Sequence, residues 1–156
     1  MPTYDAAPLQ AEIEISAPPE EVWALVSDLP RMAAWSPQVV RTFVRGGRPV
    51  ALGTKTVNIN RSGPFFWPTN SKVIEFEPAR RLTFRIKDNW MHWSYQLDAT
   101  PDGGTRVVHR REAPDGLAPI SARFQRLAMG GPEKFDAQVR AGMDTTLERI
   151  KAEVES

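Results

Sequence analysis

Two basic residues near the end of the β-rich part of the chain are the first candidates for chemistry. Alternation over residues 105–112 puts Val107, His109 and Arg111 on one face. If Val107 points inward, an imidazole that can move protons lies beside a guanidinium that can hold a carboxylate, enolate or phosphate. If Val108 points inward instead, both groups lie on a solvated face, as charged strand segments usually do.

Tyr95 is the third candidate catalytic residue. Alternation over residues 90–100 places the more apolar side chains of this segment on one face: Met91, Trp93, Tyr95 and Leu97. A buried tyrosine hydroxyl needs a hydrogen-bond partner, so Tyr95 could fix a polar atom of a ligand or move a proton. The alternative is an ordinary core aromatic bonded to a backbone carbonyl. His92 falls on the opposite face, and we expect it at the surface.

Further residues are candidates for ligand binding because they are aromatic, adaptable or amide-bearing. The aromatic run 65–67 lies between two prolines and predicts either the mouth of a pocket or the packing of an edge strand. The preceding strand carries amide and guanidinium groups that could contact a ligand or could lie at an exposed turn: Asn58, Asn60 and Arg61. Methionines suit a loosely specified cavity but equally a helix core. The full set is Asn58, Phe65, Trp67, Phe84, Met91, Trp93, Met129, Phe135, Val139 and Met143.

A long terminal helix must position these groups. Residues 132–154 carry apolar side chains at steps of three or four: Phe135, Val139, Met143, Leu147, Ile150 and Val154. A helix of about 20 residues is roughly 30 Å long and crosses a whole small domain. A curved sheet must therefore wrap around it to bury its apolar face, and such wrapping tends to leave a hollow. We place the function in that hollow.

The remaining elements precede this helix. Residues 9–16 alternate as a half-buried strand, residues 17–28 predict a helix, and residues 29–35 predict a second short helix. Further strands are expected at 39–45, 54–60, 65–77, 82–87, 90–100 and 105–112, with a short helix around 122–128. Adjoining strands favour an antiparallel α+β sheet of about six to seven strands. We expect one domain over residues 1–156, with its core at about 9–154.

Composition excludes several classes of function. The chain has 156 residues, a net charge of +1, no cysteine and two histidines, His92 and His109. This balance argues against nucleic-acid binding, and the histidine spacing does not suggest a metal site. We expect no cofactor, since phosphate-binding and dinucleotide motifs are absent. Without a recognisable signal peptide or apolar span, we expect a cytoplasmic protein that does not insert into membranes. The oligomeric state stays open.

Several segments resemble a known family. They are residues 16–23 (SAPPEEVW), 73–82 (VIEFEPARRL), 93–95 (WSY) before 104–107 (GTRV), and 142–151 (GMDTTLERIK). Together with the order of elements, they resemble the polyketide cyclase/dehydrase and lipid-transport (SRPBCC) family of the START-related superfamily. The resemblance implies a helix-grip fold, in which a curved antiparallel sheet wraps around a long terminal helix. In the aromatase branch a cavity arginine is thought to matter. Here residues 63–67 contain none, and only Arg61 precedes them.

The leading functional hypothesis is the binding of a small, largely hydrophobic molecule in an internal cavity. A polyketide-, isoprenoid- or fatty-acyl-like compound would suit it. The protein could be an enzyme for a cofactor-free cyclisation or dehydration, in which His109 or Tyr95 moves protons and Arg111 stabilises negative charge. Alternatively, it could be a non-catalytic carrier or sensor. A protein-interaction module of the same fold would instead have a filled interior and an exposed apolar patch.

Overall fold

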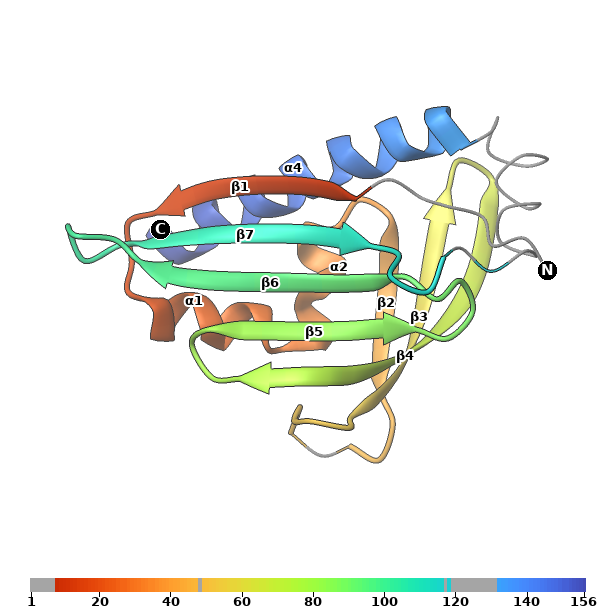
Figure 1. The fold of residues 1–156 in the computed structure, drawn as a ribbon, viewed down its shortest axis with the longest axis horizontal. Helices are drawn as coiled ribbons and strands as arrows, with labels where there is room; N and C mark the ends of the chain where they lie inside the picture. Colours follow the sequence, from red (N-terminus) through yellow and green to blue (C-terminus); the bar gives the residue numbers. More distant parts are fainter. Residues whose placement is uncertain (1–7, 48, 117, 119–131) are drawn as a thin grey trace.

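The computed structural model describes residues 8–47, 49–116, 118 and 132–156. Seven strands form one antiparallel sheet in the order β1-β7-β6-β5-β4-β3-β2. They are β1 (Leu9–Ile15), β2 (Val39–Val44), β3 (Lys55–Ser62), β4 (Phe65–Glu77), β5 (Arg81–Ile86), β6 (His92–Ala99) and β7 (Thr105–Glu112). The helices are α1 (Pro19–Val26), the 3₁₀-helix η1 (Leu29–Arg31), α2 (Met32–Trp35) and α4 (Pro132–Glu155). The α+β helix-grip architecture is therefore confirmed (Figure 1).

Local backbone effects account for the differences from the predicted boundaries. The segment 90–100 begins as a strand only at His92, because Trp90 has a positive φ of 67° and belongs to the preceding turn. The single short helix expected at 29–35 divides into η1 and α2. The helix expected around 122–128 lies outside the described residues.

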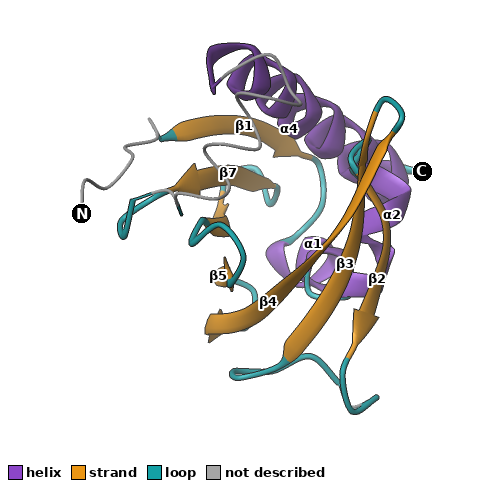
Figure 2. Ribbon diagram, turned by 90° about the vertical axis from the view of Figure 1, so that its right-hand side faces the viewer, coloured by secondary structure: helices purple, strands orange, loops and turns teal. Residues whose placement is uncertain are grey.

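The sheet bends strongly across β4. This strand has 13 residues, and its register with β5 shifts between Val73 and Glu75, an irregularity that increases bending and twist. As a result, β2 and β3 run nearly across the direction of β5, β6 and β7 (Figure 1). Figure 2 shows the curvature of the sheet, with α4 lying beside β1.

Helix α4 packs beside β1 and along α1 and α2. Its buried face includes Val139, Met143, Leu147 and Ile150, in agreement with the predicted apolar stripe. The carboxyl-terminal end is held against β1, since the Lys151 ammonium donates to the Glu14 carbonyl at 2.8 Å. The described part of the chain contains no helix with the length and hydropathy needed to cross a membrane.

The apolar core gathers around α1 and the carboxyl-terminal half of α4. Its most buried members include Ile15, Val22, Leu82, Val107 and Ile150. The inner side of β3 and β4 is different, because hydroxyl and amide side chains are buried there. The apolar core therefore occupies one part of the inner face of the sheet. The candidate site lies at the other part, where β3 and β4 bury polar side chains.

Candidate functional site

Strand β7 points its two basic candidates inward. His109 is 4% exposed and Arg111 is 1% exposed, on the same face as the fully buried Val107. Strand β7 lies between β1 and β6 in the sheet, and α4 contacts it. Val108 takes the half-buried outer phase. The sequence allowed either Val107 or Val108 to point inward. In the structure Val107 does so, together with His109 and Arg111.

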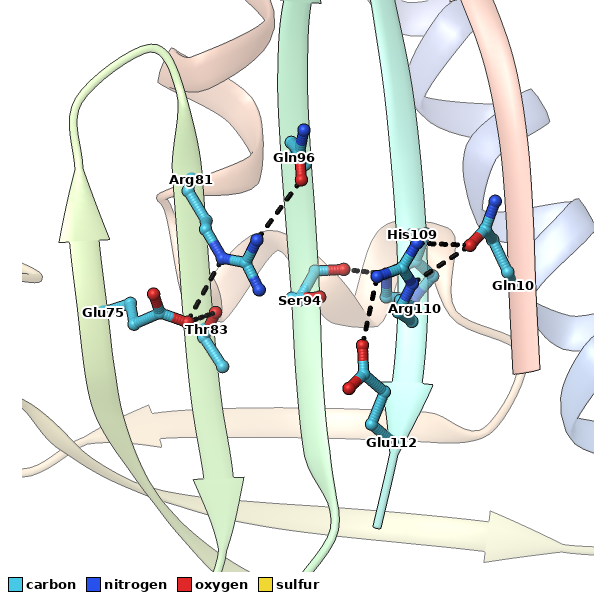
Figure 3. Close-up of polar contacts among 9 residues, drawn as sticks. All are labelled: Gln10, Glu75, Arg81, Thr83, Ser94, Gln96, His109, Arg110 and Glu112. Atoms are coloured by element: carbon cyan, nitrogen blue, oxygen red, sulfur yellow. Dashed lines mark hydrogen bonds and ion pairs between the residues drawn. The ribbon is translucent and has the colours of Figure 1, made fainter. Parts of the chain in front are cut away.

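The outer face of the sheet carries its own polar contacts. Arg110, next to His109 in β7, donates to the Gln10 side chain at 2.6 Å and to Glu112 at 3.2 Å. A similar group joins Arg81 to Glu75 at 3.1 Å. Figure 3 shows both groups together with the Ser94–His109 contact. These exposed ion pairs are expected to contribute little to stability, and they do not contact the candidate site.

His109 is fixed in orientation and tautomer. Its ring stacks on Tyr95, the cross-strand neighbour in β6, with ring centroids 4.1 Å apart and planes 10° from parallel. Its Nδ1 lies 3.0 Å from the Ser94 carbonyl oxygen (Figure 3). A carbonyl only accepts, so Nδ1 carries the proton and Nε2 keeps its lone pair. The described residues provide no hydrogen-bond partner for Nε2.

Burial also determines the charge of this pair. Desolvation lowers the pKa of His109 to about 4, so its imidazole is neutral at pH 7. Burial likewise raises the pKa of Tyr95, whose hydroxyl therefore stays protonated. The backbone-carbonyl partner considered for this hydroxyl is not found among the described residues. A neutral imidazole with a free lone pair and a protonated phenol therefore lie side by side.

Arg111 binds a carboxylate from the terminal helix. Its Nη1 lies 2.8 Å from Oδ1 of Asp136, in the amino-terminal part of α4. The Asp136 side chain is 26% exposed. Asp136 was not among the candidates predicted from the sequence. It lies outside the apolar stripe of the terminal helix, where acidic residues are usually solvated. Only the approach of α4 to β7 identifies it.

Two adjoining cavities lie between the sheet and α4. The larger, of about 340 Å³, is mostly apolar, and the smaller has about 110 Å³. The larger is lined by these predicted residues: Asn58, Trp67, Phe84, Met91, Trp93, Arg111 and Val139. The smaller is lined by Trp93, Tyr95, His109, Val139 and Met143. Four residues line both chambers and lie at their boundary: Ser36, Gln38, Trp93 and Val139.

The remaining candidates lie elsewhere. Phe65 is 45% exposed at the tip of the β3–β4 hairpin, and the structure places it at neither cavity. Met129 lies outside the described residues, and the side chain of Phe135 is likewise not described. His92, expected at the surface, is half-buried on the outer face, where its Nε2 lies 3.4 Å from a carboxylate oxygen of Asp115.

The exposed Arg61 belongs to the same hairpin as Phe65. Its guanidinium donates to the Gly63 carbonyl at 3.2 Å and lies over the Phe66 ring, 5.6 Å from the ring centroid. These contacts hold the guanidinium at the hairpin. The residue nevertheless borders the smaller chamber.

The polar inner face of β2, β3 and β4 was predicted only at Asn58 and Asn60. The Asn58 amide oxygen accepts from Thr42 at 2.9 Å, and its nitrogen lies 3.4 Å from Ser71. The Asn60 amide donates to Thr69 at 3.0 Å. A signal was present, because the polar residues at 56, 58, 60 and 62 alternate with the apolar or basic residues at 57, 59 and 61. We expected Asn58 and its neighbours at exposed turns more readily than in the interior.

Metal ligands do not gather in the described residues: no group of three or more histidine, aspartate and glutamate side chains lies close enough together. Among the described residues, the charged side chains that line the two chambers are Arg111, Asp88 and Arg61, and Asp136 binds Arg111. The hollow thus combines aromatic walls with neutral hydrogen-bonding groups. Such a lining suits a flat, largely apolar organic molecule.

Comparison with known proteins identifies the family. The model for "Polyketide cyclase / dehydrase and lipid transport" matches residues 7–155. The chain belongs to this family. The resemblance inferred from the sequence is therefore confirmed. No functionally curated protein matches the chain in sequence.

Several solved structures share the fold of this chain. A polyketide-cyclase-like protein from Corynebacterium glutamicum is 25% identical, with a TM-score of 0.65 over 95% of this chain and 91% of that one. A protein from Thermus thermophilus is 19% identical, with a TM-score of 0.69 over 95% and 97%. The aromatase/cyclase Zhui from Streptomyces sp. R1128 is 15% identical, with a TM-score of 0.71 over 96% and 93%. The last two likenesses show the fold alone.

Proposed function

We propose that this member of the polyketide cyclase/dehydrase and lipid transport family binds a small, largely apolar molecule between its sheet and α4. The observation that carries the proposal is the larger cavity, whose volume of about 340 Å³ lies within the usual range for ligand sites. Trp67, Phe84 and Met91 supply apolar surface, and Asn58 and Asn60 supply hydrogen bonds. A polyketide-, isoprenoid- or fatty-acyl-like compound fits this lining.

A catalytic version of the proposal is supported by the smaller chamber. The neutral imidazole of His109 offers its Nε2 lone pair as a proton acceptor, and the Tyr95 hydroxyl offers a proton. A ligand whose reactive carbon reached past Trp93 could undergo a cofactor-free cyclisation or dehydration. Carriers and sensors need no such groups, which is why the stacked pair favours an enzyme.

The third class, a protein-interaction module, receives less support. It requires a filled interior, whereas the described residues leave a cavity of about 340 Å³. Exposed large apolar side chains are present at two places: Phe65 and Phe66 at the β3–β4 hairpin, and Val40, Phe43 and Leu52 on β2 and in the segment after it. A partner surface at these places would leave the internal cavity without a role.

A thermal-shift screen tests the proposal. Acyl, terpenoid and aromatic compounds are added separately to the purified protein, and the unfolding temperature is measured. A ligand at about 100 times its Kd stabilises by about 2.7 kcal/mol, which corresponds to a rise of roughly 5–10 °C for a chain of this size. At least one class should produce such a rise. An unchanged unfolding temperature with every class would contradict ligand binding.

Substitution of His109 separates the enzyme from the carrier. Asparagine can still donate to the Ser94 carbonyl, but it has no group equivalent to Nε2. An enzyme with the His109→Asn change should lose turnover by about 100-fold or more while retaining affinity. A carrier should change only in affinity. His92→Asn on the outer face is the matched control and should affect neither quantity.

A further inference from the structure

The charge balance of the larger cavity limits the ligands that it can accept. Among its described lining residues, the charged side chains are Arg111 and Asp88. Arg111 is 1% exposed and already contacts the Asp136 carboxylate at 2.8 Å. The buried positive charge is therefore compensated from within the protein. It does not require an anionic ligand for compensation.

We infer that the cavity selects neutral, carbonyl- or hydroxyl-bearing molecules over carboxylates, and that Asp136 is the specificity-determining residue. This inference rests on the proposed function and names its ligand class. A ligand carboxylate that approached Arg111 would also approach Asp136, so repulsion would offset much of the attraction. Asp88, which accepts from the Asn70 backbone N–H at 2.6 Å, is the negative side chain in the described lining itself.

Neutral ligands find suitable partners in the same cavity. The Asn58 amide nitrogen has only long contacts inside the protein, 3.5 Å to Thr69 and 3.4 Å to Ser71. It can therefore donate to a ligand oxygen without giving up a strong bond. The guanidinium of Arg111 can donate to a carbonyl oxygen in its ion-paired state, since that contact transfers no net charge into the cavity.

An isosteric pair of compounds isolates the effect of charge. Binding of N-phenyl-1-naphthylamine, a neutral apolar fluorophore, is measured first, and then its displacement by 2-naphthamide and by 2-naphthoate at pH 7.5. We expect the amide to bind at least about tenfold more tightly than the carboxylate. Removing the negative charge with Asp136→Asn should tighten naphthoate binding by about tenfold and change amide binding by less than about threefold.

Two further variants complete the test. Asp144→Asn makes the same chemical change at an exposed position of α4, away from both cavities, and should leave the selectivity unaltered. The double change Arg111→Gln with Asp136→Asn removes both charges. It should keep a preference for the amide, because no positive charge is left to attract the carboxylate. A preference of this variant for naphthoate would overturn the inference, and this result can be read even if Asp136→Asn alone does not fold.

The outcomes distinguish a failure of ligand binding from a failure of the proposed selectivity. If neither the fluorophore nor either naphthalene compound binds, the proposed function fails, and the inference fails with it. If the compounds bind but naphthoate is equal to or tighter than naphthamide, ligand binding stands and the selectivity is overturned. If the amide preference is present but unchanged in folded Asp136→Asn, the assignment of specificity to Asp136 is overturned.

Discussion

Three neighbours hold His109 in one orientation and one protonation state. The Ser94 carbonyl accepts from Nδ1, Tyr95 stacks on one side, and Trp93 lies 5.5 Å away between ring centroids. Burial then opposes protonation, which lowers the pKa to about 4. At the residue scale the site is therefore a base kept neutral by its surroundings.

This environment makes stability depend on pH. The pKa of His109 is about 4 in the folded chain and about 6.5 when unfolded, so the unfolded state binds the extra proton as pH falls through that window. Stability should therefore be lost on acidification, by about 2 kcal/mol between pH 7.5 and pH 5 from this residue alone. Urea unfolding at both pH values measures the loss.

Two variants show whether His109 causes that loss. In His109→Asn the difference in unfolding free energy between pH 7.5 and pH 5 should shrink by about 2 kcal/mol. In His92→Asn, which leaves the buried imidazole in place, the difference should stay as in the wild type. An equal pH dependence in His109→Asn and wild type would contradict a buried neutral imidazole.

The Tyr95 hydroxyl is expected to serve the ligand rather than the fold. Since it has no partner among the described residues, Tyr95→Phe keeps the stack on His109 and removes no internal hydrogen bond. The unfolding free energy should change by less than about 1 kcal/mol. Affinity for a phenolic or hydroxylated ligand should fall at least severalfold in isothermal titration. A large loss of stability without a loss of affinity would assign the hydroxyl a structural role.

At the scale of elements, α4 passes closely over the segment that follows α2. A Cβ atom added at Gly142 would lie 3.4 Å from Cγ of Pro37, about at van der Waals contact. Gly142 also borders the smaller chamber. The helix thus gives up some intrinsic stability at a point where it meets the loop and the cavity.

Gly142→Ala should therefore stabilise the protein slightly. Alanine is favoured over glycine inside a helix by up to about 1 kcal/mol, and the added methyl group fits against Pro37 with little movement. Urea or thermal unfolding measures the gain. Gly142→Leu is the control for space, and it should destabilise because its side chain cannot be accommodated there. A destabilised alanine variant would show that α4 and the loop are packed more tightly.

At the scale of the whole molecule, the bent sheet and α4 together enclose the two chambers. Val139 borders both chambers from the helix side, opposite the aromatic and polar walls contributed by the strands. A larger side chain at this position fills space that a ligand would occupy. Ligand binding as proposed depends on the space that the sheet and α4 leave unfilled between them.

Val139→Phe should separate ligand binding from folding. The larger side chain should reduce affinity for apolar aromatic probes at least about tenfold, because it occupies the boundary of both cavities. Filling empty space should change the unfolding free energy by no more than about 1–3 kcal/mol. Val154→Phe, near the carboxyl-terminal end of α4, is the matched control and should bind the probe normally. Normal binding by Val139→Phe would place the ligand elsewhere.

Local pattern predicted the elements and an antiparallel α+β sheet beside a long terminal helix, and the family resemblance added the helix-grip fold. The period of two in residues 9–15 and 105–112 and the period near 3.6 in the terminal helix identify strands and helix, because each pattern reflects the geometry of one element. The same alternation showed that His109 and Arg111 share a face. It did not show which face, since Val107 and Val108 supply an apolar residue to each side.

Tertiary structure decided what faces the hollow. The register of β7 with β6 set His109 opposite the buried Tyr95, and the bend at β4 brought the asparagines of β3 to the cavity. Asp136 meets Arg111 across 25 positions of sequence, a contact that no local pattern encodes. Periodicity describes one element at a time, whereas the charge and volume of a cavity depend on how several elements meet.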